Sequence, residues 1–387
     1  MLRAGRNLGI MGEQYDKAVS LDELWKANRQ CKKGVADKDT PIEWHLHPIT
    51  KCRKLQVSLE EGKYKTHRGT KVQIYRPKRR EATAPAYADR VWQRSMCNNG
   101  VYDDLTRGFI LDNMACQKGK GNDLAIRRVV RMLQKLHRKA PGQTVYGIHL
   151  DVKKFFPSTP HSGLKEMDRH RIRDPNFLPY LFEIIDNSAD ERPKEVIEAD
   201  PFGERGTGLG SQINQLHQVA YLDKLDHELK CFCKWYIRYN DDFLILDHDK
   251  EIVRKARDTI EEWLTNLGLT MTLKQGIFKA EYGFGFLRKR FILTKTGKVI
   301  IRLHKHALAD ERNVLRAIHK RVVSGEETMD FVKRHYQSIV ANFEYAGDAP
   351  IRAMDKFYTR LFRQKPEYKR KKRYLYGNYQ ERKKKTG

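Results

Sequence analysis

The pattern of hydrophobic and polar residues predicts a chain that mixes helices with strands. Apolar residues recur at helical spacing over residues 16–34, 124–136 and 252–267. In the first of these segments Ser20 and Glu23 form the pattern of a capping box. Shorter apolar or alternating runs predict strands at residues 71–75, 145–152, 235–239, 243–246, 269–273, 291–293 and 299–301. Residues 305–362 return to helical spacing, so we expect an α+β protein that continues into a small helical bundle.

Three aspartates lie at the ends of the predicted strands. Asp151 ends the strand at 145–152, and Asp241 and Asp242 form the turn of a hairpin. Clustered carboxylates raise each other's pKa unless cations neutralise them, and their hard oxygen atoms suit magnesium. Taken alone, Asp241 and Asp242 would be an ordinary acidic turn. Their apolar flanks and the distant third carboxylate favour a metal site.

The charge balance indicates the class of partner. Lys and Arg number 76 against 49 Asp and Glu, which gives a formal net charge of +27. A surplus of this size is typical of proteins that bind nucleic acid. The content of 40% hydrophobic and 10% aromatic residues indicates a folded core rather than a small basic adaptor. The six cysteines lack disulfide spacing, and no apolar run approaches the roughly 20 residues of a membrane span. We therefore expect a cytoplasmic protein with no membrane partner.

Several motifs in order along the chain resemble those of the reverse transcriptases. Residues 236–246 read Tyr-Ile-Arg-Tyr-Asn-Asp-Asp-Phe-Leu-Ile-Leu and resemble the tyrosine-x-aspartate-aspartate box. Residues 149–158, His-Leu-Asp-Val-Lys-Lys-Phe-Phe-Pro-Ser, are similar to the metal-binding strand that precedes that box. Residues 206–212, Gly-Thr-Gly-Leu-Gly-Ser-Gln, resemble the glycine-rich segment that supports the template and the incoming nucleotide. The similarity extends from about residue 50 to residue 362 and is to bacterial members of the group II intron-like and retron-type superfamily.

This resemblance implies a right-hand polymerase fold with fingers, palm and thumb, an antiparallel palm sheet and a helical thumb. The implied parts are an N-terminal helical extension at 1–50, fingers at 51–145, a palm at 146–300 with a fingers insertion at about 160–205, and a thumb at 301–362. Residues 363–387 hold eleven Lys or Arg and two Glu and are expected to be a basic tail.

The resemblance also implies an activity and its cofactors. The chain would be an RNA-directed DNA polymerase, a nucleotidyltransferase, that uses two Mg²⁺ ions for which Mn²⁺ can substitute. Asp151, Asp241, Asp242 and the backbone carbonyl of Val152 would hold the metals, and Lys274 would protonate the leaving pyrophosphate. The competing interpretation of Lys274 is an exposed lysine at a strand end. The expected partners are an RNA template, a DNA product and deoxynucleoside triphosphates, with an accessory protein or a second copy of the chain as further candidates.

Further binding residues follow from the same resemblance. The nucleotide contacts would come from Lys78, Arg80, Lys118, Phe156, Gln212 and Tyr239, and the template or primer contacts from Arg90, Gly210, Ser211, Phe286 and Leu287. Phe156 would lie beneath the sugar and exclude a 2′-hydroxyl group. Its neighbour Phe155 is the better candidate for an ordinary core position, because neighbours on a strand face opposite ways. Gln117 stands where many relatives have an arginine that reaches the phosphates, and Lys118 could supply that contact instead.

The serine and glutamine at 211 and 212 indicate a subgroup. They are similar to diversity-generating retroelement and defence-associated "unknown group" reverse transcriptases, so we expect a role in antiphage defence with a structured, cognate non-coding RNA as template. Diversity generation by mutagenic retrohoming is the alternative. An RNA-binding, maturase-like scaffold with a vestigial site and an RNA-templated RNA polymerase also remain open, although the intact aspartates and Phe156 argue against them.

Overall fold

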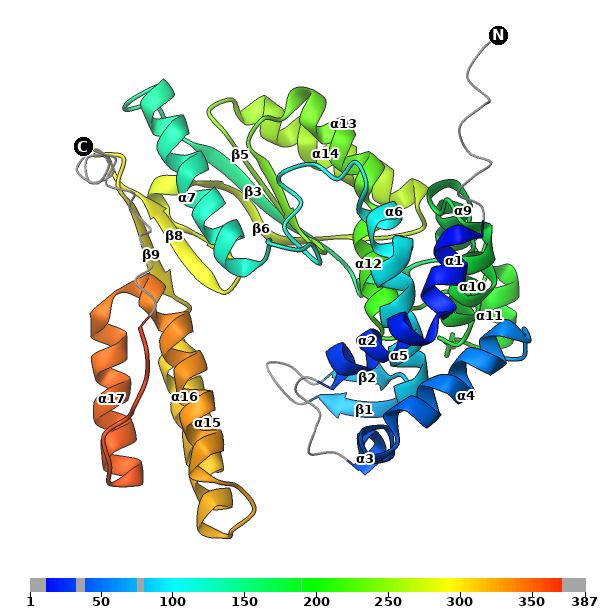
Figure 1. Cartoon of the computed structure of the whole chain (residues 1–387). Coiled ribbons are helices and arrows are strands. Elements are labelled where there is room, and N and C mark those ends of the chain that lie inside the picture. Colours follow the sequence, from blue (N-terminus) through cyan, green and yellow to red (C-terminus); the bar gives the residue numbers. More distant parts are fainter. Residues whose placement is uncertain (1–11, 33–38, 75–79, 189, 371–387) are drawn as a thin grey trace, which may run out of the picture. The chain divides into compact units, whose positions relative to one another are not determined.

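The computed structural model describes residues 12–32, 39–74, 80–188 and 190–370 (Figure 1). The chain divides into two units. Unit 1 comprises Met1–Gly121, Leu150–Phe243 and Lys255–Thr272, and unit 2 comprises Asn122–His149, Leu244–Arg254 and Leu273–Gly387. The predicted cluster at 76–80, apart from Arg80, and most of the predicted tail lie outside the described residues.

The strands of the described residues form three sheets. β1 (Thr70–Ile74) pairs antiparallel with β2 (Arg80–Ala84). A second sheet, also antiparallel, consists of β7 (Phe284–Phe286), β8 (Lys289–Leu293) and β9 (Val299–Leu303). The third has the order β4-β5-β3-β6 and consists of β4 (Tyr236–Tyr239), β5 (Asp242–Asp247), β3 (Tyr146–Val152) and β6 (Met271–Lys279). Of its inner strands, β5 is apolar and buried between its two terminal aspartates, which is the pattern of a strand buried on both faces, whereas β3 contains buried and half-buried positions.

Helices make up most of unit 1 and enclose a core around Trp92. They are α1 (Glu13–Val19), α2 (Leu21–Cys31), α3 (Asp39–Leu46), α4 (Pro48–Glu60), α5 (Tyr87–Met96), α6 (Tyr102–Thr106), α8 (Phe155–Ser158), α9 (His161–Arg171), α10 (Leu178–Asp186), α11 (Lys194–Ala199), α12 (Gln212–Tyr221) and α13 (Asp223–Phe232). A π-helix (Cys97–Val101) joins α5 to α6, and a 3₁₀ turn (Pro175–Phe177) precedes α10. The amphipathic α12 contacts α5, α6, α9 and α10, so its N-terminus has a defined position within the unit. α14 (Lys250–Asn266) contains residues of both units.

Unit 2 contains α7 (Asn122–Lys139), the antiparallel sheet and a helical bundle. In the bundle, α15 (Ala307–Val323), α16 (Met329–Phe343) and α17 (Asp348–Phe362) pack on one another (Figure 1). A 3₁₀ turn (Ala280–Tyr282) precedes β7 and another (Glu344–Ala346) precedes α17. The bundle core includes Leu315, Tyr336 and Met354, all of them buried. The Tyr336 hydroxyl donates to Asp355 at 2.7 Å, which satisfies the polar end of this ring.

These elements confirm the predicted α+β class, the antiparallel pairing and the helical bundle at 305–362. The predicted division into fingers, palm and thumb stays a prediction. None of the described helices combines the length and the apolar composition needed to cross a membrane.

Two predicted elements need correction. The helix expected at 16–34 is interrupted at Ser20, which has extended backbone angles and begins α2 by accepting a hydrogen bond from the Glu23 amide. An N-cap residue is not itself helical, so the capping pattern marked a boundary between two helices. The Glu23 carboxylate contacts Lys26 at 3.0 Å and does not complete a reciprocal box. The strand expected at 269–273 begins later, at Met271, and continues to Lys279.

Candidate active site

The three predicted aspartates come together in unit 1. Asp151 is the penultimate residue of β3, Asp241 lies in the turn between β4 and β5, and Asp242 begins β5. Sequence analysis placed both Asp241 and Asp242 in the turn, and the structure corrects this for Asp242. β3 and β5 are neighbours in the sheet, and the Val152 amide donates to the Asp241 carbonyl at 3.3 Å. Residues that are far apart in the sequence therefore form one acidic cluster.

The electrostatics of the cluster favour a bound cation. Burial raises the pKa of Asp241 to about 7, with further increases from the negative charges of Asp151 and Asp242 and from a hydrogen bond with Asp151. Burial and the charges of Asp151 and Asp242 thus disfavour ionisation of Asp241. Divalent cations remove this penalty, and oxygen-rich sites are those that Mg²⁺ and Mn²⁺ prefer. The donor set fits the metal ions that the sequence implies.

The turn between β4 and β5 contains a residue with left-handed backbone angles. Asn240 has a φ of 58°, in the left-handed region that asparagine tolerates better than most residues. Its side-chain amide donates to an Asp241 carboxylate oxygen at 3.3 Å. Asn240 and Asp241 together make the two-residue connection of the hairpin.

A buried ion pair anchors this turn. Arg238 and Asp226 are both fully buried, and the guanidinium group donates to the two carboxylate oxygens at 2.7 and 2.5 Å. Arg238 also donates to the carbonyl of Asn240 at 2.8 Å and to that of Val219 at 3.0 Å. Asp226 accepts a further hydrogen bond from the Tyr236 hydroxyl. The turn is therefore tied to the ends of α12 and α13 by charge-assisted hydrogen bonds.

The glycine-rich segment at 206–212 lies against β2. The Thr83 amide donates to the Leu209 carbonyl at 2.6 Å. Gly210 has a φ of 124°, and a Cβ atom there would lie 2.5 Å from the Thr83 carbonyl oxygen. Glycine is needed at this position because both the backbone angle and the close approach exclude a side chain.

Ser211 and Gln212 begin α12. The Ser211 hydroxyl caps the helix by accepting from the Asn214 amide at 3.2 Å, and it donates to the Gln93 side chain at 2.9 Å. Ser211 is buried, whereas Gln212 is partly exposed at the helix N-terminus. Ser211 thus has a structural role that is sufficient to explain it, and its contact with a template stays a prediction.

Phe155 and Phe156 differ in burial as expected, although they lie in the short helix α8 and not on a strand. Phe155 is 2% exposed, and Phe156 is partly exposed. The Phe156 carbonyl accepts from the Thr207 amide at 2.8 Å and from its hydroxyl at 3.3 Å. The glycine-rich segment therefore holds the backbone of Phe156, a contact that the sequence pattern did not predict.

The other predicted residues of unit 1 are more dispersed. Tyr239 ends β4, and burial raises the pKa of its hydroxyl group. The Lys118 ammonium lies 4.3 Å from the centre of the Tyr102 ring, and the Arg90 guanidinium lies 5.6 Å from that of Tyr87. Lys78 and the side chain of Arg80 lie outside the described residues. Their proposed contacts with nucleotide or template stay predictions.

Three predicted residues belong to unit 2. Lys274 is exposed on β6. Leu287 has a φ of 48° in the turn that joins β7 to β8. Phe286 is 1% exposed and packs edge-on against His149, with ring centres 5.6 Å apart. Any contact of Phe286 with a primer would have to come from its backbone, because the ring is inside the unit.

Sequence analysis missed the residues that support the aspartates. Arg238 lies within the residues that resemble the tyrosine-x-aspartate-aspartate motif, but no role was predicted for it or for its partner Asp226. The available signal was a single arginine within an otherwise apolar strand, which requires a buried partner. Lys153 and Lys154, both exposed and directly after Val152, were also missed. Lys154 has a φ of 48°, an unfavourable angle for lysine in a segment beside a carboxylate cluster.

Comparisons with known proteins give structural likenesses alone. The sequence matches no protein-family model, and it matches no curated protein. The chain is similar to the structure of telomerase from Candida albicans with a TWJ fragment of telomeric RNA, with 10% identity and a TM-score of 0.45 over 82% of this chain and 66% of that one. Telomerase from Candida tropicalis with a TWJ fragment gives 12% identity and a TM-score of 0.45 over 84% of this chain and 59% of that one.

The apo form of the Candida tropicalis enzyme gives 11% identity and a TM-score of 0.42 over 81% of this chain and 64% of that one. The chain thus spans less than two thirds of the length of each of these structures. With TM-scores below 0.5, the functional argument rests on the residues of the site.

The buried ion pair predicts a large loss of stability when one partner is removed. Arg238→Met leaves the Asp226 carboxylate buried without its cation and should lower the free energy of unfolding by about 3–5 kcal/mol. Arg257→Met, which removes half of an exposed pair with Asp258, should cost less than about 1 kcal/mol. Urea unfolding followed by tryptophan fluorescence measures both. Equal losses in the two variants would contradict the anchoring role of Arg238.

The raised pKa of Asp241 predicts how stability without metal depends on pH. Between about pH 4 and pH 7 the folded state retains a proton on Asp241 that the unfolded chain has lost, so the free energy of unfolding should fall as the pH rises. Asp241→Asn removes this dependence. The free energy of unfolding of the variant minus that of the parent should therefore be larger above pH 7 than at pH 5, by at least about 1 kcal/mol. Urea unfolding in EDTA measures the difference. Parallel curves for the two proteins would show that folding does not raise the pKa of Asp241.

Proposed function

We propose that this protein is a reverse transcriptase, an RNA-directed DNA polymerase with a right-hand fold. The observation that carries the proposal is the cluster of Asp151, Asp241 and Asp242, in which burial and like charges raise the pKa of Asp241 to about 7. An acidic hairpin turn with only a structural role would gain nothing from this unfavourable arrangement. The proposed fingers are residues 51–145, the palm 146–300 and the thumb 301–362.

The aspartates and the carbonyl of Val152 are the proposed ligands of two Mg²⁺ ions. Two such ions, when bound, activate a primer hydroxyl and stabilise the charge of the departing pyrophosphate. The chain supplies the positions of the ligands. Arg238 holds the Asn240 carbonyl, and the bond from the Val152 amide holds the Asp241 backbone beside β3. Lys274 is the proposed proton donor to pyrophosphate.

Residues around the cluster would bind the incoming nucleotide. Phe156, whose backbone is held by Thr207, is the proposed barrier to a 2′-hydroxyl group. The exposed Lys153 and Lys154 add positive charge two and three residues after Asp151 and suit a triphosphate. Gln212 and Tyr239, both partly exposed, are further proposed nucleotide contacts, together with Lys78, Arg80 and Lys118.

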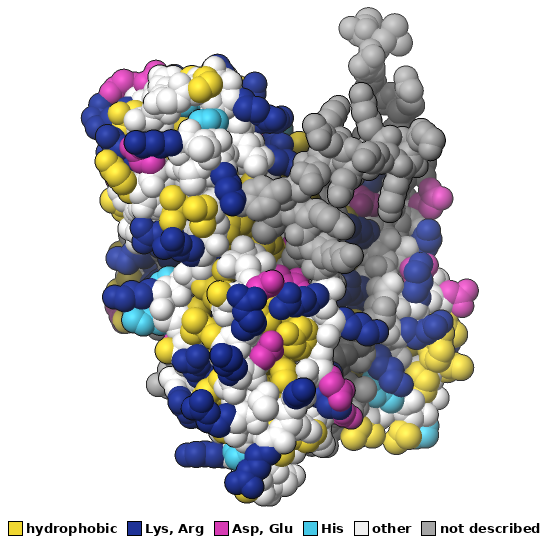
Figure 2. Space-filling model, turned by 90° about the vertical axis from the view of Figure 1, so that its left-hand side faces the viewer, with side chains coloured by type: hydrophobic (Ala, Val, Ile, Leu, Met, Phe, Trp, Pro, Cys, Tyr) yellow, Lys and Arg dark blue, Asp and Glu magenta, His cyan; other side chains and the backbone are white. Residues whose placement is uncertain are grey.

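The distribution of basic residues supports binding of a nucleic-acid duplex. In unit 2 the exposed positions of α7 are strongly basic and include Arg127, Arg131, Lys135, Arg138 and Lys139. Figure 2 shows a face of the molecule on which Lys and Arg side chains clearly outnumber Asp and Glu. Phosphate groups are the partners that such a surface favours, since counterion release contributes to their binding.

The template is proposed to be a structured, cognate RNA, and the biological role antiphage defence. Support for both comes from the similarity of residues 210–212 to defence-associated and diversity-generating enzymes. Sequencing the RNA and DNA that co-purify with the protein separates the two roles. A discrete non-coding RNA with its DNA copy supports defence, whereas a copy of a variable-protein gene would replace that role with diversity generation.

The polymerase proposal predicts that Asp241→Asn loses DNA synthesis. The purified chain with its co-purifying RNA, deoxynucleotides and Mg²⁺ should produce DNA, and Asp241→Asn should lower the rate at least about a hundredfold through the loss of a metal ligand. Asp247→Asn, at the other end of β5, is the matched control and should remain active. RNA binding without any DNA product from the parent protein would reject the polymerase and favour an RNA-binding scaffold.

The proposed role of Phe156 predicts altered sugar selection. Phe156→Ala should reduce the preference for deoxynucleotides over ribonucleotides at least about tenfold, because the ring no longer excludes the 2′-hydroxyl. Phe182→Ala is the control, since this partly exposed ring contacts Lys165 and Arg169 instead. Incorporation of each nucleotide type by both variants measures the preference. An unchanged preference in Phe156→Ala would assign the barrier to another residue.

A further inference from the structure

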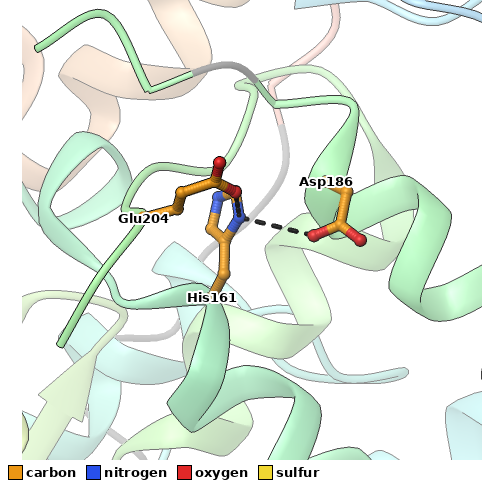
Figure 3. A group of neighbouring side chains, drawn as sticks. All are labelled: His161, Asp186 and Glu204. Atoms are coloured by element: carbon orange, nitrogen blue, oxygen red, sulfur yellow. Dashed lines mark ion pairs between the residues drawn. The ribbon is translucent and has the colours of Figure 1, made fainter. Parts of the chain in front are cut away.

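A second group of potential metal ligands lies in unit 1, apart from the three aspartates in sequence. It consists of His161 at the start of α9, Asp186 at the end of α10 and Glu204 in the loop before the glycine-rich segment (Figure 3). One ligand atom from each residue lies within 4.8 Å of the others. The Nδ1 atom of His161 is 3.6 Å from an Asp186 oxygen and 3.5 Å from a Glu204 oxygen.

The environment of His161 leaves one ring nitrogen available to a ligand. The imidazole is 4% exposed, and its Nε2 atom is 2.6 Å from the Gly206 carbonyl oxygen. A carbonyl oxygen only accepts hydrogen bonds, so Nε2 carries a proton and the neutral ring has its lone pair on Nδ1. Among the described residues Nδ1 has no hydrogen-bond partner, although it is buried and directed at the two carboxylates (Figure 3). Metal-binding histidines commonly have this arrangement, with the other nitrogen donating to a backbone carbonyl.

We propose that His161, Asp186 and Glu204 bind a divalent transition-metal ion of the zinc class. Tetrahedral ligands at about 2.0–2.2 Å from zinc are roughly 3.3–3.6 Å from one another, which matches the two separations from Nδ1. An imidazole nitrogen with two carboxylates suits zinc better than magnesium, which favours an all-oxygen shell. The exposed sides of Asp186 and Glu204 leave room for water as the remaining ligand.

Lys165 competes for this site. Its ammonium group lies 2.6 Å from Oδ1 and 2.8 Å from Oδ2 of Asp186, and Oδ1 is the oxygen that faces His161. A metal ion must therefore displace Lys165 from Asp186 or share the carboxylate with it. If the three residues bind a metal ion, removal of the lysine should strengthen metal binding. If they only form ion pairs with one another, removal of the lysine should have no effect on metal binding.

A metal ion here would stabilise the approach to the glycine-rich segment. Two backbone hydrogen bonds already hold the segment around His161 against the segment before the glycine-rich residues. The His161 amide donates to the Glu204 carbonyl at 2.9 Å, and the Gly206 amide donates to the Thr159 carbonyl at 2.9 Å. Pro160 and Arg205 form an antiparallel bridge between these two segments. The ion would add a link from this bridge to the end of α10, and bound metal should raise the melting temperature of the protein.

The test is a Zn²⁺ titration of the full chain against a chromophoric chelator, in an Asp241→Asn background that weakens metal binding at the aspartate cluster. We expect one tight site per chain, and Co²⁺ bound there should show the visible absorption of a tetrahedral nitrogen and oxygen site. His161→Gln and Glu204→Gln should each weaken Zn²⁺ binding at least about tenfold, and Lys165→Gln should strengthen it. His170→Gln, on the same helix and paired with Glu166 at the surface, should change nothing.

Glu204 is 62% exposed, so Glu204→Gln provides the test even where His161→Gln does not fold. Zinc affinity and melting temperature that are the same with and without the Glu204 carboxylate would overturn the proposal. In that case the three residues would contact one another without a metal ion.

Discussion

The buried ion pair between Arg238 and Asp226 is the interaction on which the acidic centre depends. Two opposite charges with no exposure to solvent are stable only as a fully hydrogen-bonded pair, and Arg238 meets this condition with Asp226 and the carbonyls of Asn240 and Val219. The same bonds connect the hairpin turn to the helices behind it. A turn held in this way can keep Asp241 beside Asp151 although the two carboxylates repel each other. Loss of either partner would leave a buried charge without its counter-ion and would release the turn.

The glycine-rich segment is the second element that orders the centre. It contacts β2 through Leu209 and Gly210, holds the Phe156 backbone through Thr207, and begins α12 with the Ser211 cap. These contacts are made largely by backbone atoms, which explains why small residues occupy the segment. The group of His161, Asp186 and Glu204 lies at the start of the same segment. The position of the segment therefore links the proposed nucleotide site with the proposed zinc site.

Periodicity predicted the elements whose burial is simple. α7 and α14 have one apolar face each, and β3 and β5 are short, mostly apolar runs with an aspartate at or next to an end. The interruption at Ser20 was missed, because the apolar spacing continues across this residue and only its backbone angles depart from a helix. Arg238 was missed for a related reason, since a hydrophobicity pattern treats a buried arginine as an exception and does not identify its partner. Asp226, Thr207 and Glu204 gain their roles from neighbours that are distant in sequence.

The sequence by itself determined the types of element, the identity of the three aspartates and the basic character of the protein, because each of these depends on residue type and local spacing. The tertiary structure alone decided which side chains share an environment. In the folded chain Asp241 is buried beside two other carboxylates, and Phe286 is buried inside its unit. The Nδ1 atom of His161 faces two carboxylates. Burial and mutual charge depend on contacts between distant segments, and local spacing contains no information about those contacts.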